Sequence, residues 1–552
     1  MDAELGRALP VTRLRVLVTD EVDPRGVDLL RAEPALEVDE RPTRPWRDLV
    51  AEIGGYDAFV GRSATQLPAD LLRAATKLRV VGRAGVGTDN IDLPAATSLG
   101  IAVINAPSGN TIAVAELFFG ALLSFVRHLP RAFSSMRDGR WDRSDLLGTE
   151  LAGRSLGIVG LGRIGGEVAI RAHAFGMRVA AFDPYVQRER FELLRVDRAD
   201  TLAELLPRAD ILTVHTPITD ETRGMIDAAA LNRLPEGAIV ANFARGGIVA
   251  ESALAAALES GRVHGALLDV YTKEPLAAGD PFRRIDNVLL TPHLGASTAE
   301  GQRNVAVDVC VAVRDALLTG DLSGAVNLAG VDRGRWRDLR GAVALARQST
   351  EIARALLADR NAKAIEQITL HVGRQFAGGE SLLAAAVAAG ALRGITGDDR
   401  ITLVNARARA AERGIAIAAV PLQAAEDAHT IRVAVRGEGQ QLVIGGVAAL
   451  GVGPRITRIG EFKVDVAPRH TLLVLTNADV PGVIGRVGTL LGAAGVNIAE
   501  YHQARLREGG EALAAVAVDG RIDDALRRRL LALGDILSAS VINFGDTGDV
   551  PD

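Results

Sequence analysis

The stretch that decides the fold is Ser155–Pro184, SLGIVGLGRIGGEVAIRAHAFGMRVAAFDP. It begins with a short apolar run, Leu156–Val159, which predicts a buried strand. A glycine-rich turn follows, and the pattern after it predicts a helix that ends near Phe175. A second apolar run, Arg178–Phe182, predicts another strand. Strand, turn, helix and strand in this order indicate a parallel βαβ unit.

Three glycines in the turn explain what this unit is for. Gly160 permits a tight turn, Gly162 lets the backbone approach a pyrophosphate, and Gly165 lets the helix pack closely on the strand. The helix N-terminus then offers backbone N–H donors to the phosphates. The pattern predicts a dinucleotide site.

Asp183 ends the second strand and gives a further signal. A carboxylate at this position accepts hydrogen bonds from both hydroxyls of the adenine ribose and repels a 2′-phosphate. No arginine follows Asp183 directly, so the sequence favours NAD over NADP. The alternative is that Asp183 only begins the turn before Pro184.

Length and composition narrow the class of protein. The 552 residues suggest three or four domains, and 48% hydrophobic with 4% aromatic residues suits α/β layers. The net charge of -5 gives no electrostatic reason to expect a nucleic acid or a membrane surface as partner. Cys310 is the single cysteine, which fits a reducing cytosol. Met1–Leu14 lacks a signal-peptide core, and Leu117–Val126 is shorter than the roughly 18 residues of a spanning helix, so we expect a cytoplasmic protein.

Two loops before this unit carry arginine. Arg62 lies in GRSAT and Arg83 in GRAGVG, each directly after a predicted strand of an alternating strand and helix pattern. The carboxyl ends of parallel strands meet at one edge of a sheet, so the two arginines together predict a trap for an anionic substrate. Taken singly, each is a solvated surface charge.

The segment between the two regions contains a predicted hinge and an exposed loop. Asn105–Thr111 interrupts the pattern before a helix over Ile112–His128 and indicates a hinge between domains. Beyond the helix, Met136–Arg143 is a basic loop that contains a tryptophan. It is either a plain surface loop or a contact with a subunit or an anion, and the sequence leaves both open.

Three later loops carry the residues for alcohol oxidation. Arg245, Glu274 and His293 follow successive predicted strands of the same half-sheet and should converge at its edge. An imidazole, whose unperturbed pKa is about 6.5, can take a hydroxyl proton, a carboxylate can orient it, and a guanidinium can grip a substrate carboxylate. Each residue alone also has a plain structural explanation as a loop or capping residue.

The motifs GRSAT, GRAGVGTDNID, GLGRIGGEVA, NFARGGIV, DVYTKEP and TPHLGAST occur in this order and resemble the D-isomer-specific 2-hydroxyacid dehydrogenases, above all the members that act on D-3-phosphoglycerate. The resemblance implies Arg245, Glu274 and His293 as catalytic residues. The NAD contacts that it implies, with the three glycines, are Gly160, Gly162, Arg163, Ile164, Gly165, Asp183, Thr216, Phe243, Ala244, Arg245, Asp269, His293, Leu294, Gly295 and Ala296. The implied substrate contacts are Arg62, Ser63, Arg83 and Asn110. Two positions depart from the family pattern: Ala250 replaces a usual acidic residue, and Gln66 a frequent lysine.

The resemblance extends to the long type of these enzymes and implies four domains. A flavodoxin-like substrate domain spans residues 12–108 and 296–325, and a Rossmann-like, doubly wound NAD domain is inserted as residues 109–295. An α+β intervening domain follows over 326–466, and a ferredoxin-like ACT domain over 467–545. The ACT string DVPGVIGRVGTLL implies an L-serine effector site at Asn477, Asp479 and Asn497. The alternative is a module used only for assembly.

We therefore expect an allosteric, NAD-dependent oxidation of D-3-phosphoglycerate to 3-phosphohydroxypyruvate, the first step of L-serine biosynthesis. A homo-oligomer, dimer or tetramer, is expected, and no metal site. One alternative is a dehydrogenase for another D-2-hydroxyacid. Another is a non-catalytic protein that senses NAD.

Overall fold

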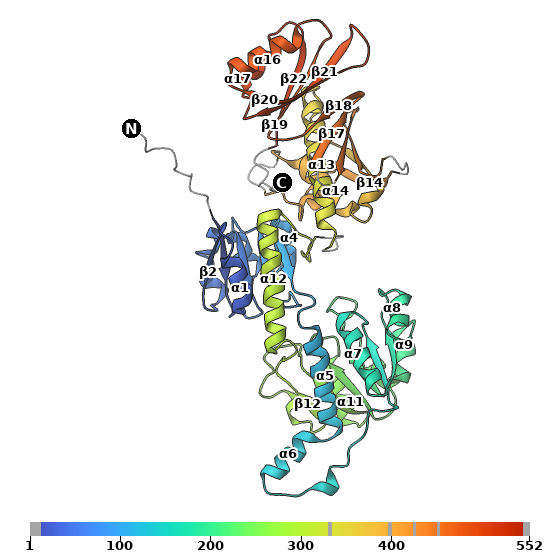
Figure 1. The fold of residues 1–552 in the computed structure, drawn as a ribbon. Coiled ribbons are helices and arrows are strands. Elements are labelled where there is room, and N and C mark those ends of the chain that lie inside the picture. Colours follow the sequence, from blue (N-terminus) through green and yellow to red (C-terminus); the bar gives the residue numbers. More distant parts are fainter. Residues whose placement is uncertain (1–12, 329–333, 396–399, 423–426, 450–452, 545–552) are drawn as a thin grey trace, which may run out of the picture. The chain divides into compact units, whose positions relative to one another are not determined.

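The computed structural model describes residues 13–328, 334–395, 400–422, 427–449 and 453–544 (Figure 1). The predicted domain limits at residues 12 and 545, and residues 329–333 of the predicted junction, lie outside this range. The chain divides into two compact units. The first holds residues up to 83, 87–105 and from 309 on, and the second holds 84–86 and 106–308.

The first sheet of the first unit is parallel, with strand order β2-β1-β3-β4-β5. Its strands are β1 (Leu14–Val18), β2 (Leu36–Glu40), β3 (Ala58–Gly61), β4 (Val80–Arg83) and β5 (Ala102–Asn105). Its helices are α1 (Pro24–Arg31), α2 (Trp46–Leu49), α3 (Ala69–Ala74) and α4 (Leu93–Ser98). This order is the flavodoxin-like one, as predicted. The sequence analysis missed β2, in which three of the five residues LEVDE are acidic and only Leu36 is buried, and the short β5.

The second unit is built on a parallel seven-stranded sheet of order β12-β11-β10-β9-β6-β7-β8. Its strands are β6 (Ser155–Val159), β7 (Arg178–Phe182), β8 (Asp197–Arg198), β9 (Ile211–Val214), β10 (Ala238–Asn242), β11 (Val263–Leu268) and β12 (Val288–Leu290). Its helices are α5 (Thr111–Val126), α6 (Leu129–Arg137), α7 (Arg163–Ala174), α8 (Arg188–Leu193), α9 (Leu202–Leu205), α10 (Ala228–Arg233) and α11 (Glu251–Glu259). The order reverses beside β6, which gives the doubly wound fold that the sequence predicts.

The helix α12 (Ala299–Thr319) leads out of the second unit into the rest of the first. There, a six-stranded mixed sheet of order β14-β13-β15-β16-β17-β18 packs against the long helix α13. The elements are α13 (Trp336–Asp359), β13 (Gln367–Val372), α14 (Glu380–Leu392), α15 (Ala406–Glu412), β14 (Ala416–Pro421), β15 (Thr430–Gly437), β16 (Gln440–Ala449), β17 (Gly453–Ile459) and β18 (Phe462–Val466). This is the α+β region expected between the dehydrogenase and ACT parts.

The last region has the βαββαβ order and the antiparallel sheet β20-β21-β19-β22 of a ferredoxin-like fold. Its elements are β19 (Thr471–Ala478), α16 (Val483–Ala493), β20 (Asn497–Arg505), β21 (Glu511–Asp519), α17 (Asp524–Leu531) and β22 (Ile536–Asn543). One face of the sheet shares a core with α13, and the other packs under α16 and α17. The Gln348 amide also donates to the Pro468 carbonyl at 2.8 Å, which ties α13 to the start of this region.

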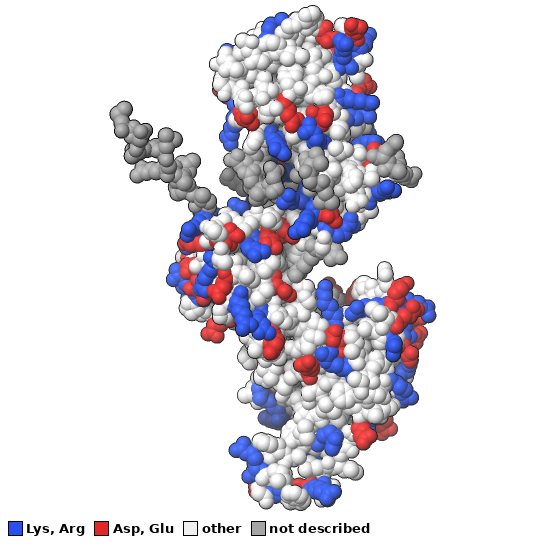
Figure 2. Space-filling view, in the orientation of Figure 1, with Lys and Arg blue, Asp and Glu red and all other residues white. Residues whose placement is uncertain are grey.

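Charge is mixed on the face drawn in Figure 2, where basic and acidic side chains are interspersed. Within the described ranges no single helix has the length and apolar composition to cross a membrane, and one pair bent by 62°, α5 with α6, meets that test together.

Candidate active site

The glycine-rich turn between β6 and α7 has the geometry that its chemistry requires. Gly160 has a φ of 94°, in the left-handed region, and a Cβ there would lie 2.8 Å from the His215 carbonyl oxygen. A Cβ on Gly165 would lie 2.1 Å from the Gly160 oxygen, so α7 can start only with glycine at this point. A Cβ on Gly162 would meet no heavy atom within 4 Å in the described chain, which leaves open space over the turn. The turn is closed on the protein side and open where a phosphate would approach.

Asp183 joins the turn to the end of β7. One carboxylate oxygen accepts from the Leu161 amide at 2.8 Å, and the other accepts from the Tyr185 and Val186 amides at 3.0 and 3.2 Å. The residue therefore starts the turn after β7 and also fixes the glycine-rich turn. The interpretation that Asp183 begins the turn before Pro184 is confirmed, and its contact with the adenine ribose stays a prediction.

The remaining residues around the turn fit a bound dinucleotide. Arg163 and Ile164 are the first two residues of α7. The Thr216 hydroxyl, after the end of β9, is buried and has no hydrogen-bond partner among the described residues. A buried polar group without a partner is consistent with a contact to a ligand. Phe243 and Ala244 are buried after β10, and Phe243 packs edge-on against Phe118 at 5.9 Å. These residues would hold NAD.

His293 and Glu274 form a hydrogen-bonded pair. The His293 Nδ1 atom lies 2.7 Å from a Glu274 carboxylate oxygen, and the other carboxylate oxygen accepts from the Tyr271 amide at 3.1 Å. The side chains are 48% and 37% exposed, so a substrate can reach them. Since Nδ1 is engaged, Nε2 is the nitrogen left to exchange a proton with a ligand.

Asp269 holds the backbone on which His293 is mounted. It is fully buried, and it accepts from the Thr291 hydroxyl at 2.6 Å and from the Leu294 and Gly295 amides at 2.7 and 2.9 Å. Burial raises the pKa of this carboxyl, while the three hydrogen bonds act in the opposite direction. His293 has a φ of 55°, a strained value for a non-glycine residue, and the bonds on both sides of it hold that conformation. A direct contact of Asp269 with NAD stays a prediction.

Arg245 lies at the same edge of the sheet, because β10, β11 and β12 are neighbours in the sheet. Its guanidinium donates to the Ala244 carbonyl at 2.6 Å, and its own carbonyl accepts from the Asn242 amide at 2.9 Å. A Cβ on Gly246 would lie 2.0 Å from the Tyr271 carbonyl carbon, so the Arg245 loop packs directly against the loop that carries Glu274. The three predicted catalytic residues therefore sit on adjoining loops.

The departure at Ala250 is accompanied by a local acidic group. Glu251, the next residue, accepts from the Thr272 amide at 2.5 Å and from the Thr272 hydroxyl at 2.8 Å. This contact ties α11 to the loop between β11 and Glu274.

In the first unit, the two substrate arginines lie at neighbouring strand ends. Gly61 pairs with Arg83 across β3 and β4, so Arg62 follows directly at the same edge. Ser63 is exposed in the same loop, and Gln66 donates to its carbonyl at 3.3 Å. Their role in substrate binding stays a prediction.

The sequence analysis missed the residues that hold this loop. The buried Asp20, at the end of β1, accepts from the Arg62 and Thr65 amides at 2.9 Å each and from the Thr65 hydroxyl at 2.5 Å. The Asn90 amide donates to the Arg62 and Thr65 carbonyls at 2.9 and 2.7 Å. A polar residue directly after an apolar strand, as in LVTD, was the signal available for Asp20.

Asn110 belongs to the second unit, at the start of α5. It is 9% exposed, and its side-chain oxygen has no hydrogen-bond partner among the described residues. An unsatisfied buried acceptor is consistent with a ligand contact, which stays a prediction.

The three predicted effector residues do not come together within one chain. Asn477 pairs with Ala512 at one end of β21, whereas Asn497 pairs with Asp519 at the other end. At about 3.4 Å per residue, the ends of this strand are roughly 24 Å apart. Asp479 lies beyond Asn477, where it accepts from Arg505 at 3.1 Å and the Gly509 amide at 3.2 Å, and these contacts lower the pKa of its carboxyl. Asn497 instead donates to Asp519 at 2.7 Å.

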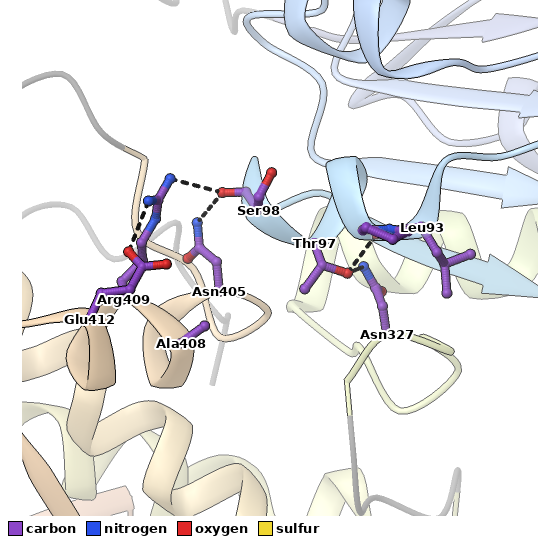
Figure 3. A pocket seen from close by; sticks show the side chains of 9 residues that line it. Leu93, Thr97, Ser98, Asn327, Asn405, Ala408, Arg409 and Glu412 are labelled. Carbon is purple, nitrogen blue, oxygen red and sulfur yellow. Dashed lines mark hydrogen bonds and ion pairs between the residues drawn. The ribbon is translucent and has the colours of Figure 1, made fainter.

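A hollow of about 490 Å³ lies between α4 and α15 (Figure 3). Asn405 and Arg409 donate to the Ser98 carbonyl at 3.2 and 3.4 Å, and Arg409 also pairs with Glu412 at 3.1 Å. Asn327 donates to the Thr97 hydroxyl at 3.1 Å. The polar groups around the hollow are hydrogen-bonded to one another, so we interpret the hollow as part of the packing contact between α4 and α15.

The chain is similar to known proteins over both its dehydrogenase part and its ACT region. A family model described as "D-isomer specific 2-hydroxyacid dehydrogenase, NAD binding domain" matches residues 119–295, and one described as "ACT domain" matches residues 470–535. D-3-phosphoglycerate dehydrogenase of Synechocystis sp. is 36% identical over 538 residues, which cover 97% of this chain and 95% of that protein. The proteins of the same name from Bacillus subtilis and Mycobacterium bovis are 36% and 37% identical, and the matches cover 96% and 97% of this chain and 99% and 100% of theirs.

Two solved structures are similar to the dehydrogenase part. One, a protein from Thermus thermophilus, is 35% identical with a TM-score of 0.51 and covers 55% of this chain and 97% of its own. The other is D-lactate dehydrogenase from Aquifex aeolicus, complexed with NAD and lactic acid; it is 28% identical with a TM-score of 0.50 and covers 56% of this chain and 97% of its own. The chain therefore belongs to the D-isomer-specific 2-hydroxyacid dehydrogenase family, with an ACT domain over residues 470–535.

Proposed function

We propose that this chain catalyses the NAD-dependent oxidation of D-3-phosphoglycerate to 3-phosphohydroxypyruvate, the first step of L-serine biosynthesis. The observation that carries the proposal is the hydrogen bond of 2.7 Å between His293 and Glu274. The loop that carries Glu274 also packs against the loop that carries Arg245. The names of the relatives that match nearly the full chain support the choice of substrate.

In the proposed reaction, the His293 Nε2 atom takes the proton of the substrate C2 hydroxyl. Glu274, hydrogen-bonded at Nδ1, orients the ring and stabilises the positive charge that forms on it. NAD, when bound, would supply the acceptor for the C2 hydride. Loss of the hydroxyl proton and of the C2 hydride converts the alcohol to the carbonyl. Arg245 supplies a fixed positive charge for the substrate carboxylate and the carbonyl oxygen.

Arg62 and Arg83 supply positive charge for the remaining anionic group. They lie at adjoining strand ends, and Asp20 and Asn90 hold the loop of Arg62 before any ligand binds. A loop fixed in advance loses little entropy when substrate binds.

The test is NADH consumption by the purified protein with 3-phosphohydroxypyruvate, hydroxypyruvate, pyruvate and glyoxylate. We expect the highest kcat/KM with the phosphorylated substrate, and a loss of that preference in Arg62→Gln. Equal or higher kcat/KM with an unphosphorylated keto acid would favour a different D-2-hydroxyacid as substrate. NADH binding without turnover of any of the four would favour a cofactor-sensing protein.

We infer that the chain forms a homo-oligomer through α6 and the segment after it, which project from the second unit in Figure 1. This segment exposes large apolar side chains: Phe133 is 66% exposed, Trp141 77% and Leu147 88%. Such a cluster on one projection is typical of a protein contact. Light scattering should give a multiple of the 58.0 kDa chain mass, and a smaller particle for Phe133→Ser with Trp141→Ser.

We also infer that L-serine binds the ACT domain between two copies of the chain. Within one chain, Asn477 on β19 and Asn497 on β20 lie beside opposite ends of β21. A second copy, aligned in the opposite direction, can bring its Asn497 beside Asn477. We also infer a cytoplasmic location, which this metabolic role and the presence of a single cysteine, Cys310, support.

A further inference from the structure

Arg190, on the short helix α8, contacts the glycine-rich turn from outside the motif. Its Nε atom donates to the Leu161 carbonyl at 2.7 Å, and its Nη2 atom donates to the Gly162 carbonyl at 2.7 Å. Both bonds are short and charge-assisted, the stronger class of hydrogen bond. One guanidinium thus fixes two consecutive carbonyl groups of the turn.

The glycine after the motif makes this contact possible. A Cβ on Gly166 would lie 2.8 Å from the Arg190 Nη2 atom, where a methyl group and the guanidinium could not both remain. The dinucleotide motif itself requires Gly160, Gly162 and Gly165, and it gives no reason for a glycine at position 166. The approach of Arg190 gives that reason.

Arg190 acts together with Asp183, which precedes it on the same segment. Asp183 accepts from the Leu161 N–H at 2.8 Å, and Arg190 donates to the Leu161 carbonyl, so the residue is held from both ends. The Gly162 carbonyl also accepts from the Gly166 amide at 3.0 Å, the first hydrogen bond of α7. The carbonyl groups of the turn therefore face Arg190 and the helix, which leaves the N–H groups at the start of α7 for a phosphate.

We propose that Arg190 is a positioning residue for the dinucleotide: it orients the glycine-rich turn and adds positive charge beside the pyrophosphate without contacting the reacting atoms. The proposal rests on the proposed use of NAD. It predicts that the contribution of Arg190 belongs to the diphosphate part of the cofactor, because the carbonyls it holds belong to the turn that faces the phosphates.

The experiment compares Arg190→Gln with Arg188→Gln as control. Arg188 is on the same helix, is 77% exposed and pairs only loosely with Glu192 at 3.5 Å. Binding of NADH is followed by its fluorescence, and ADP and adenosine are then used as competitors. We expect Arg190→Gln to weaken NADH and ADP by about tenfold, in line with two lost charge-assisted bonds, while adenosine affinity changes less than about twofold. Arg188→Gln should match the wild type.

Two further variants test the geometry. Arg190→Lys keeps the charge but not the two-nitrogen fork, so it should recover only part of the NADH affinity. Gly166→Ala leaves the guanidinium intact but displaces it, and should also weaken ADP more than adenosine. In steady state, Arg190→Gln should raise the KM for NAD and leave kcat at saturating NAD within about twofold, because the His293 pair is untouched.

A uniform loss of NADH, ADP and adenosine affinity, with a lower melting temperature, would mean that Arg190 only anchors α8 and would overturn the proposal. Unchanged ADP affinity in Arg190→Gln would overturn it as well. Fluorescence binding requires no turnover. If the proposed reaction fails but Arg190→Gln still weakens ADP selectively, only the reaction is wrong and the role of Arg190 stands.

Discussion

The loops after β10, β11 and β12 and the ACT region are both predicted to bind small charged molecules, but only in the loops do the predicted residues lie together within one chain. In the first, Asp269 and Glu274 hold the loop and the ring of His293 through contacts of 2.6 to 3.1 Å. In the ACT region, Asn497 donates to Asp519 at one end of β21, and Asn477 lies on β19 beside the other end of β21.

The difference follows from which end of its strand each residue occupies. Arg245, Glu274 and His293 all follow the carboxyl ends of parallel strands, and these ends meet at one edge of the sheet. In the ACT sheet β19 and β20 also end at the same edge, because both run antiparallel to β21, but Asn477 lies near the end of β19 whereas Asn497 begins β20 and so lies at the opposite edge. A single substitution in one chain should therefore impair catalysis directly. At the effector residues, the loss of serine inhibition should depend on which variants are combined in one oligomer.

The largest effect is expected at His293. His293→Ala removes the group that takes the hydroxyl proton, and we expect kcat to fall by about 10³-fold, within the usual range for general bases. NADH should still bind with near wild-type affinity, because the glycine-rich turn is unaffected. His264→Asn, an exposed histidine on β11, is the matched control. Turnover retained in His293→Ala would remove this residue from the mechanism.

A smaller loss is expected at Glu274. Glu274→Gln keeps a hydrogen bond to His293 but removes the negative charge that stabilises the protonated ring, so kcat should fall about 10- to 100-fold. NADH affinity should stay near the wild-type value, since the glycine-rich turn is unaffected. A kcat within about twofold of the wild type would show that the carboxylate does not act through His293.

The half-buried His215 should make the second unit less stable as the pH falls from 7 to 5. Its Nε2 lies 3.0 Å from the Thr213 hydroxyl, its Nδ1 has no partner among the described residues, and burial lowers the pKa of this ring to about 3. An unfolded histidine titrates near 6.5, so the unfolded state binds the extra proton between about pH 6.5 and 3 and stability falls as pH falls through that window.

Because His215 keeps some exposed surface, we expect a loss of only about 1–2 kcal/mol from pH 7 to pH 5. Hydrogen exchange should show faster opening of β6 and β9 at about pH 5 and unchanged protection of β19 and β21. His215→Gln should flatten the response of the second unit. An equal change of hydrogen exchange in the second unit and in the ACT region would show that His215 is not the source of the acid sensitivity.

The smallest effect is expected in the effector site. Asn477→Ala and Asn497→Ala should each weaken L-serine inhibition about tenfold, with kcat unchanged, and Glu508→Gln in the turn before β21 is the control.

Mixed oligomers of the two variants show whether the serine site lies within one chain or between two. If the site lies between two copies, one intact site per pair reappears and serine sensitivity partly returns. No recovery in the mixture would place the site within a single chain.

Much of the fold could be predicted because its signals are local. The apolar runs that became β6, β7 and β10 and the glycines at 160, 162 and 165 all lie within short windows of sequence. The strand β2 was missed because three of its five residues are acidic and only Leu36 is buried. Its place beside β1 therefore depends on strand pairing and not on composition.

The sequence by itself determined which residues follow strand ends, and hence that Arg245, Glu274 and His293 share one edge of a parallel sheet. Only the tertiary structure decided what holds them and their neighbours: Asp269 beneath the His293 loop, Asp20 beneath the Arg62 loop, and Arg190 against the glycine-rich turn. The physical reason is that strand periodicity is a property of neighbouring residues, whereas these hydrogen bonds join residues 25 to 42 positions apart, which only the pairing of strands and the packing of helices and loops bring together.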